Sequence, residues 1–328
     1  MKQVIGISLG ERQQDFTLRT ELLGQKLQVR RLGTDGNVAE AGRLLRHWGT
    51  RADAIGLGLA KDSGNLADGG ADPRRAARLR AKVHHVPFSN GERLADILLE
   101  WAVRHAQSTL GHYFDNARVL FFSGLAHQKL ALSMAEYTPN LRFADPVLQL
   151  GSPKLLSSLD ALDLYASGMH YVSDWVPRRL VSGPLMAQWA QYVLKRAACH
   201  ATVLVAPVHQ LDGLGLEELA GKTLITHTVN EARLAAFKDK GVHLVIDAAP
   251  LVQGHAIDPS LFDAMLLAAT GRHGGDLVDD DYLEILGSEG LQPRLLYPNG
   301  FKRVNRFAFV IHPLSQEYFK KVQPVEVL

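Results

Sequence analysis

A glycine and a later acid form the first pair of residues in this chain whose types and spacing could do chemistry. The segment from Ala117 to Pro146 reads as a strand, a tight turn at Ser123-Gly124, a helix and a second strand that ends at Asp145. In a dinucleotide-binding βαβ unit, the glycine lets backbone amides approach the pyrophosphate, and the acid binds a ribose hydroxyl. Ser123, Gly124 and Asp145 are therefore predicted to bind NAD or NADP, and the acid favours NAD because it repels a 2′-phosphate.

The glycine pattern of this turn is incomplete, which leaves two interpretations open. After Gly124 only Ala126 fits a small position, and Lys129 occupies the third one. The turn either binds a nucleotide or belongs to a parallel βαβ unit that kept its fold without the ligand. Asp145 has the same two interpretations, since an Asp before Pro146 is also a common turn residue.

Polar side chains also end two later strands. Thr226 and Thr228 follow an apolar run, and Asp247 ends the run LVID. Ligands of open α/β sheets bind at the carboxyl ends of the strands, so these three residues are predicted to contact the cofactor or substrate. The alternatives are structural: Asn230 beside them is placed to cap the next helix, and Asp247 precedes a turn at Pro250.

Lys61 and Asp62 follow another apolar run and are predicted to be the catalytic pair. A Lys and an Asp in a cleft between domains can transfer the proton of a hydroxyl that is being oxidised; the alternative is a solvated loop pair. The fourteen histidines show no metal-binding spacing such as HExxH, so no metal is predicted. Cys199 is the single cysteine, which excludes an internal disulfide, and its apolar context predicts a buried, inert thiol.

The elements that must position these residues alternate between strand and helix, which predicts an α/β fold. We expect a small N-terminal α/β domain at 1–112, a Rossmann-like parallel-sheet domain at 113–300 and a strand-turn-helix tail at 301–328. In the first domain the expected elements are a strand, a hairpin, a helix, a strand and a long helix, at 4–9, 16–32, 38–48, 54–59 and 92–110. In the second, strands are expected at 119–122, 141–144, 202–206, 223–226 and 243–246, and helices at 231–240, 259–270 and 280–286.

Composition excludes several classes of function. The chain is 46% hydrophobic and 21% charged, as in ordinary globular proteins, and its net charge of +2 is too small for a dedicated nucleic-acid binder. Its start does not resemble a signal peptide, and no apolar run reaches the length of a membrane span. We therefore expect a cytoplasmic protein with neither a membrane span nor a nucleic-acid partner.

Several segments resemble a bacterial family known as quinate 5-dehydrogenase-like, or Rossmann-type dehydrogenase-like, proteins. They are VIGISLG, RRLGTDGNVAEAGRLL, ADAIGLGL, LAGKTLITHTVNEARLAAFKDKGVHLVIDAAP and DDDYLEILGSEGLQPRLLYPNG. The final segment, NRFAFVIHPLSQEYFKKVQPVEVL, is similar to the opening of the long-chain acyl-carrier-protein reductase family. The second resemblance implies a downstream reductase domain or a partner reductase.

Two hypotheses for function follow. The first is an NAD(P)-dependent oxidoreductase that acts on a hydroxy acid or an acyl-derived carbonyl. The second is a non-catalytic nucleotide- or acyl-binding module that positions or regulates a partner reductase, in one arrangement as a homodimer. The second explains the incomplete glycine pattern better.

Overall fold

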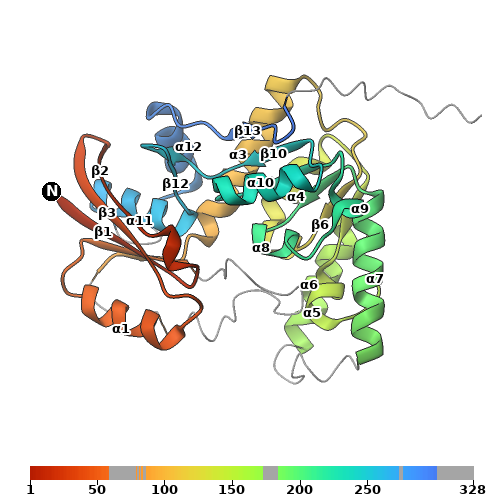
Figure 1. The fold of residues 1–328 in the computed structure, drawn as a ribbon, viewed down its shortest axis with the longest axis horizontal. Coiled ribbons are helices and arrows are strands. Elements are labelled where there is room, and N and C mark those ends of the chain that lie inside the picture. The colour runs from red at the N-terminus through yellow and green to blue at the C-terminus, as the bar shows by residue number, and fades with distance from the viewer. Residues whose placement is uncertain are drawn as a thin grey trace, which may run out of the picture.

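Two mainly parallel sheets, each covered by helices on both faces, make up this protein (Figure 1). The computed structural model describes residues 1–58, 86–172, 184–272 and 276–300, together with Leu79, Ala81 and Val83. This architecture confirms the predicted α/β class. The predicted catalytic pair, Lys61 and Asp62, and the tail at 301–328 lie outside the described residues.

The first sheet has five strands in the order β2-β3-β1-β4-β5. They are β1 (Lys2–Ser8), β2 (Phe16–Leu22), β3 (Gln25–Gly33), β4 (Ala54–Gly58) and β5 (Phe88–Ser89). The expected hairpin is present as the antiparallel pair β2 and β3, and Leu23 and Gly24 turn the chain with positive φ angles of 49° and 70°. Two positive φ angles suit a tight hairpin because they match the twist of its strands. β1 pairs in parallel with β3 and β4.

Alternate side chains of the first sheet enter two different cores. Ile5 and Ile7 pack with α1 (Val38–Trp48), whereas Val4 faces α11 (Pro259–Thr270). Helix α11 therefore returns from far along the chain to lie on the N-terminal sheet (Figure 1). Glycines allow this close approach: a Cβ on Gly56 would lie 2.3 Å from the Ser260 carbonyl oxygen.

The second sheet has six strands in the order β13-β10-β9-β8-β6-β7. They are β6 (Val119–Phe121), β7 (Leu141–Phe143), β8 (Val203–Val205), β9 (Thr223–Thr226), β10 (Leu244–Asp247) and β13 (Arg294–Leu296). All pairs are parallel except the one between β10 and β13, an edge strand that our sequence analysis missed. From β6 the chain runs to β7 on one side and later to β8 on the other. The strand order thus reverses between β6 and β8, which is where doubly wound sheets bind their ligands.

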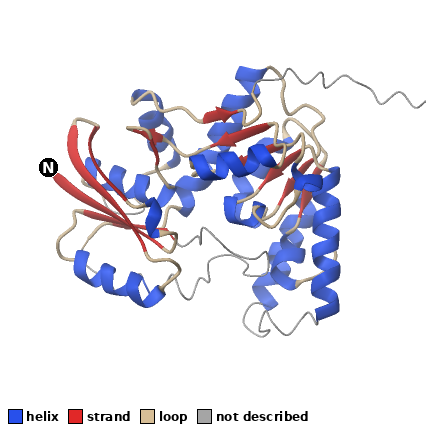
Figure 2. Ribbon diagram, in the orientation of Figure 1, coloured by secondary structure: helices blue, strands red, loops and turns tan. Residues whose placement is uncertain are grey.

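Helix α3 (Glu92–Leu110) lies between the two sheets (Figure 2). Its buried side chains share one core with Val4 of the first sheet and Phe121 of the second. The helices around the second sheet are α4 (Gln128–Ala135), α5 (Asp145–Leu150), α6 (Leu159–Val172), α7 (Pro184–His200), α8 (Val208–Leu211), α9 (Leu216–Leu219), α10 (Glu231–Asp239) and α12 (Asp279–Ser288). The remaining short pieces are the 3-10 turns η1 (Arg12–Gln14) and η2 (Leu125–His127) and the strands β11 (Leu251–Val252) and β12 (His255–Ala256). None of the described helices combines the length and apolar character that a membrane crossing needs.

Candidate functional site

The carboxyl ends of β6, β8, β9 and β10 lie along one edge of the second sheet, because these strands run in parallel. The residues that follow these strands therefore share that edge. Among the predicted residues they include Ser123 and Gly124 after β6, Thr226 and Thr228 at and after β9, and Asp247 at the end of β10. Asp145 follows β7 at the same edge.

Asp145 is fully buried and bonded to the turn after β6. Its Oδ2 accepts a hydrogen bond from the Gly124 amide at 2.8 Å, and its Oδ1 accepts from the Leu125 amide at 3.1 Å and the Ser123 hydroxyl at 3.4 Å. Burial raises the pKa of this carboxyl, and the two amide hydrogen bonds oppose that rise. Both oxygens thus accept hydrogen bonds from within the chain, and the predicted role of Asp145 in binding a ribose stays a prediction.

Gly124 is needed for packing. Its φ is −71°, so the backbone does not require a glycine. A Cβ at this position would instead lie 2.4 Å from the ring of Phe143 and 2.9 Å from Leu162. The space beside Gly124 is filled by the chain's own side chains, and its amide is bonded to Asp145.

Asp247, at the end of β10, bonds the turn after β9 in the way that Asp145 bonds the turn after β6. It is fully buried, and it accepts hydrogen bonds from the amides of Thr228 at 2.8 Å and Val229 at 2.9 Å, in the turn after β9. It also accepts from the amide of Ala249 at 3.0 Å and from the Arg294 guanidinium on β13. In both places a carboxylate at the end of one strand fixes the turn that follows its neighbour.

Thr228 combines a strained backbone with an unpaired hydroxyl. Its φ of +64° lies in the left-handed region, which is unfavourable for a β-branched residue. Within the part of the chain that the structure describes, its Oγ1 is buried without a hydrogen-bond partner, and so is the Oγ1 of Thr226. Gln210, in α8 after β8, likewise has a buried and unpaired Oε1. Strain and unpaired polar atoms of this kind concentrate at functional sites.

Two histidines lie at this edge, in the turns after β6 and β9. Burial, with a smaller contribution from the nearby His227 ring, lowers the pKa of His127 to about 4, so His127 is neutral at pH 7. Its Nδ1 has no hydrogen-bond partner and lies 3.8 Å from Oδ1 of Asp96, which is too long for a hydrogen bond. Burial also lowers the pKa of His227, while Asp247 and Asp258 oppose this effect.

The edge of the second sheet approaches the first sheet at the start of α11. Asp258, whose charge acts on His227, caps α11 by accepting from the amides of Ser260 and Leu261 at 2.9 and 3.1 Å. A Cβ on Gly58, the last residue of β4, would lie 3.6 Å from the Ser260 hydroxyl. The carboxyl end of β4 and the β9 turn therefore both lie near the start of α11.

The turn after β6 does not fit a pyrophosphate. Its two amides already donate to Asp145, and the first turn of α4 is occupied too, because Oδ2 of Asp96 accepts from the Lys129 amide at 3.3 Å. A phosphate at this helix start would meet two carboxylates where a dinucleotide site presents free amides. Lys129, which broke the expected glycine pattern, instead pairs with Asp279 of α12.

His127 and Gln210 were not predicted from the sequence, and the burial predicted for Cys199 was wrong. Both missed residues closely follow a predicted strand of the parallel sheet, and that position was the signal that could have identified them. Cys199, near the end of α7, is exposed, contrary to our expectation. In the described part of the chain no group of His, Cys, Asp and Glu side chains is arranged to hold a metal ion.

Two family models match the chain. One, described as a domain of unknown function (DUF8754), matches residues 93–298, and another, described as a domain of unknown function (DUF8753), matches residues 3–90. No curated protein sequence matches. The models divide the chain just before α3, whereas we predicted a boundary after it, at 112/113; that boundary stays a prediction.

Solved structures with a similar course of the chain share little sequence with it. Glutamate dehydrogenase from Thermus thermophilus, in its Leu-bound form, is 13% identical with a TM-score of 0.41, over 88% of this chain and 73% of that one. A protein from Mycobacterium smegmatis in complex with β-D-fucofuranose is 9% identical with a TM-score of 0.31, over 88% and 95%. A carbohydrate transporter solute binding protein from Agrobacterium radiobacter, in complex with D-arabinose, is 11% identical with a TM-score of 0.34, over 90% and 94%. These values are too low to carry a function to this chain.

Proposed function

The chain belongs to the DUF8754 family, and from that premise we propose that it binds a small, uncharged, hydroxyl-bearing molecule at the carboxyl edge of its second sheet. The observation that carries the proposal is the set of buried, unpaired polar atoms of Thr226, Thr228 and Gln210 at that edge. Buried polar atoms in folded proteins nearly always have a partner. A ligand with hydroxyl groups would supply the missing donors and acceptors.

The charges at this edge favour an uncharged ligand over a phosphate. The buried carboxylates of Asp145 and of Asp247 lie here, the latter paired with Arg294, and Asp96 of α3 accepts from the Lys129 amide of α4 beside them. His127 is neutral at pH 7 because its pKa is about 4, so it adds no positive charge. A neutral imidazole can both donate and accept a hydrogen bond, which suits a hydroxyl or a carbonyl group.

An NAD(P)-dependent oxidoreductase acting on a hydroxy acid or acyl-derived carbonyl is the second candidate. The reversal of strand order between β6 and β8 supports it, because nucleotides bind at such points. The occupied amides of Gly124 and Leu125 speak against it. The non-catalytic role beside a partner reductase, and the homodimer, stay predictions.

The proposal is tested by removing one unpaired hydroxyl without changing the shape of the side chain. Thr226→Val should raise the free energy of unfolding by about 1 kcal/mol, because an unpaired buried hydroxyl costs that much or more. Thr138→Val is the matched control. Thr138 is equally buried, but its hydroxyl donates to the Ala117 carbonyl at 2.7 Å, so this change should destabilise the protein.

Ligand binding is measured on the same two variants by calorimetry. Pentoses, small polyols, hydroxy acids, NADH and NADPH are titrated into the unmodified protein, and each binder is then titrated into the variants. We expect a sugar or polyol to bind, and Thr226→Val to weaken it at least tenfold while Thr138→Val leaves its affinity unchanged. Binding of NADH or NADPH alone would favour the oxidoreductase, and equal affinities in both variants would remove Thr226 from the site.

A further inference from the structure

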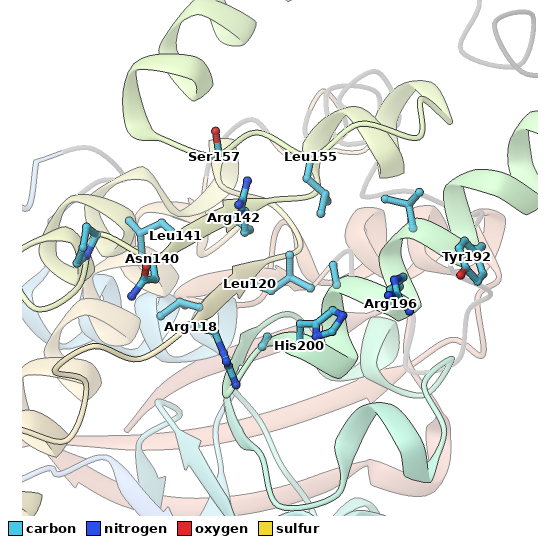
Figure 3. A pocket seen from close by; sticks show the side chains of 15 residues that line it. Arg118, Leu120, Asn140, Leu141, Arg142, Leu155, Ser157, Tyr192, Arg196 and His200 are labelled. Carbon is cyan, nitrogen blue, oxygen red and sulfur yellow. The ribbon is translucent and has the colours of Figure 1, made fainter. Parts of the chain in front are cut away.

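A second possible ligand site lies at the opposite end of the second sheet. A cavity of about 550 Å³ is bounded by the amino-terminal ends of β6 and β7 and by helix α7 (Figure 3). Ligand pockets commonly have volumes of roughly 300 to 1,000 Å³, so this one is large enough for a small organic molecule. The residues discussed above lie at the carboxyl edge, so this cavity is separate from the proposed site.

The floor of the cavity is apolar. Leu120 of β6 and Leu155 contribute from the sheet side, and Val193 and Ala197 contribute from α7. Tyr192, which is 58% exposed, adds an aromatic ring from the same helix. An apolar floor with an aromatic edge suits the hydrocarbon or ring part of a ligand.

Positive charge borders this floor on two sides. Arg142 pairs in register with Leu120 across β7 and β6, and Arg118 lies two residues before Leu120, so all three occupy the same face of the sheet. Arg196 and His200 are one helical turn apart on α7 and lie on the facing side (Figure 3).

The arginines at this cavity lack acidic partners. Within the ranges that the structure describes, no carboxylate forms an ion pair with the guanidinium of Arg118, Arg142 or Arg196. By contrast, Arg104 of α3 pairs with two glutamates. Unpaired guanidinium groups at one cavity are available to an anion, and their planar fork matches a carboxylate or a phosphate.

We propose that this cavity binds an amphipathic organic anion, with its carboxylate or phosphate at the arginines that border the cavity (Arg118, Arg142 and Arg196) and its apolar body on Leu120 and Val193. The polar head alone would gain little, because exposed charge pairs are weak in water. The apolar floor supplies the rest of the affinity, through burial of hydrocarbon surface. The ligand therefore needs both parts.

The test uses decanoate and decyl phosphate as probes and decanol as their uncharged counterpart, each titrated into the full chain by calorimetry below its micelle concentration. We expect one or both anions to bind and decanol to bind at least tenfold more weakly. Inorganic phosphate should not displace the bound anion. If neither anion binds, or if decanol binds as tightly as the anions, the proposal is wrong.

Two kinds of variant locate the binding. Arg142→Gln and Arg196→Gln should each weaken the anion at least fivefold, whereas Arg46→Gln, an exposed change on α1, should leave its affinity unchanged. Ala197→Phe, which fills the cavity, should abolish binding while thermal unfolding confirms that the variant is folded. Unchanged affinity in Arg142→Gln and Arg196→Gln would overturn the proposal, and so would full binding by a folded Ala197→Phe protein.

Discussion

The titration of His127 gives the sharpest quantitative test of the carboxyl edge. The pKa of this buried imidazole is lowered from 6.5 to about 4, mainly by burial. Between these two values the unfolded chain binds a proton that the folded protein does not. The free energy of unfolding must therefore fall as the pH falls through this window.

The size of the effect follows from the two pKa values. One pKa unit corresponds to 1.36 kcal/mol, so the proton linkage of His127 costs about 2 kcal/mol of stability at pH 5 and about 3 kcal/mol at pH 4, relative to pH 7. His127→Gln removes this linkage. The glutamine side chain that replaces the imidazole does not titrate, so any change in stability that it causes is the same at every pH.

The assay is urea unfolding of both proteins at several pH values between 7 and 5. The difference in the free energy of unfolding between His127→Gln and the unmodified protein should shift by about 2 kcal/mol in favour of the variant over this range. Asp145 and Asp263, whose pKa values are raised by burial, contribute with the opposite sign, but they are present in both proteins and cancel in the difference. His200→Gln, at an exposed position of α7, controls for the loss of an imidazole as such. A difference that stays constant with pH would show that His127 is not buried in this way.

Two further substitutions test how the turns at this edge are held. Gly124→Ala should lower the free energy of unfolding by about 1 to 3 kcal/mol, because its Cβ would collide with Phe143. Gly287→Ala in α12 is the control: nothing lies within 4 Å of its Cβ, so this change should raise the free energy of unfolding by about 0.5 to 1 kcal/mol. Urea unfolding that ranks the two variants the other way would contradict the packing at Gly124. Asp247→Asn should cost about 3 kcal/mol, since it leaves the Arg294 guanidinium without its carboxylate and weakens the amide bonds that hold Thr228. Thermal unfolding with the exposed Asp239→Asn as control checks this, and equal melting temperatures would refute it.

Periodicity and capping residues were enough to predict most of the elements. The helices at 92–110 and 259–270 match their predicted bounds, and Asn230 caps its helix as its position suggested. These features are local, because side-chain period and backbone capping depend on residues within a few positions of each other. β13 was missed because its residues, Arg294–Leu296, are only half-buried and lack the longer apolar run that marks the equally short strands β6 and β8.

The use of each polar side chain at the carboxyl edge was decided only by the tertiary structure. From the sequence, Gly124 and Asp145 have the spacing of a nucleotide site. Polar residues that end or follow later strands are placed at the carboxyl edge of the sheet, where ligands bind: Thr226, Thr228 and Asp247. In the folded chain Asp145 and Asp247 accept hydrogen bonds from the amides of neighbouring turns, and the hydroxyls of Thr226 and Thr228 have no partner among the described residues. Spacing along the chain determines which residues reach an edge, but hydrogen-bond partners depend on how distant strands pair, and only the assembled sheet brings those strands together.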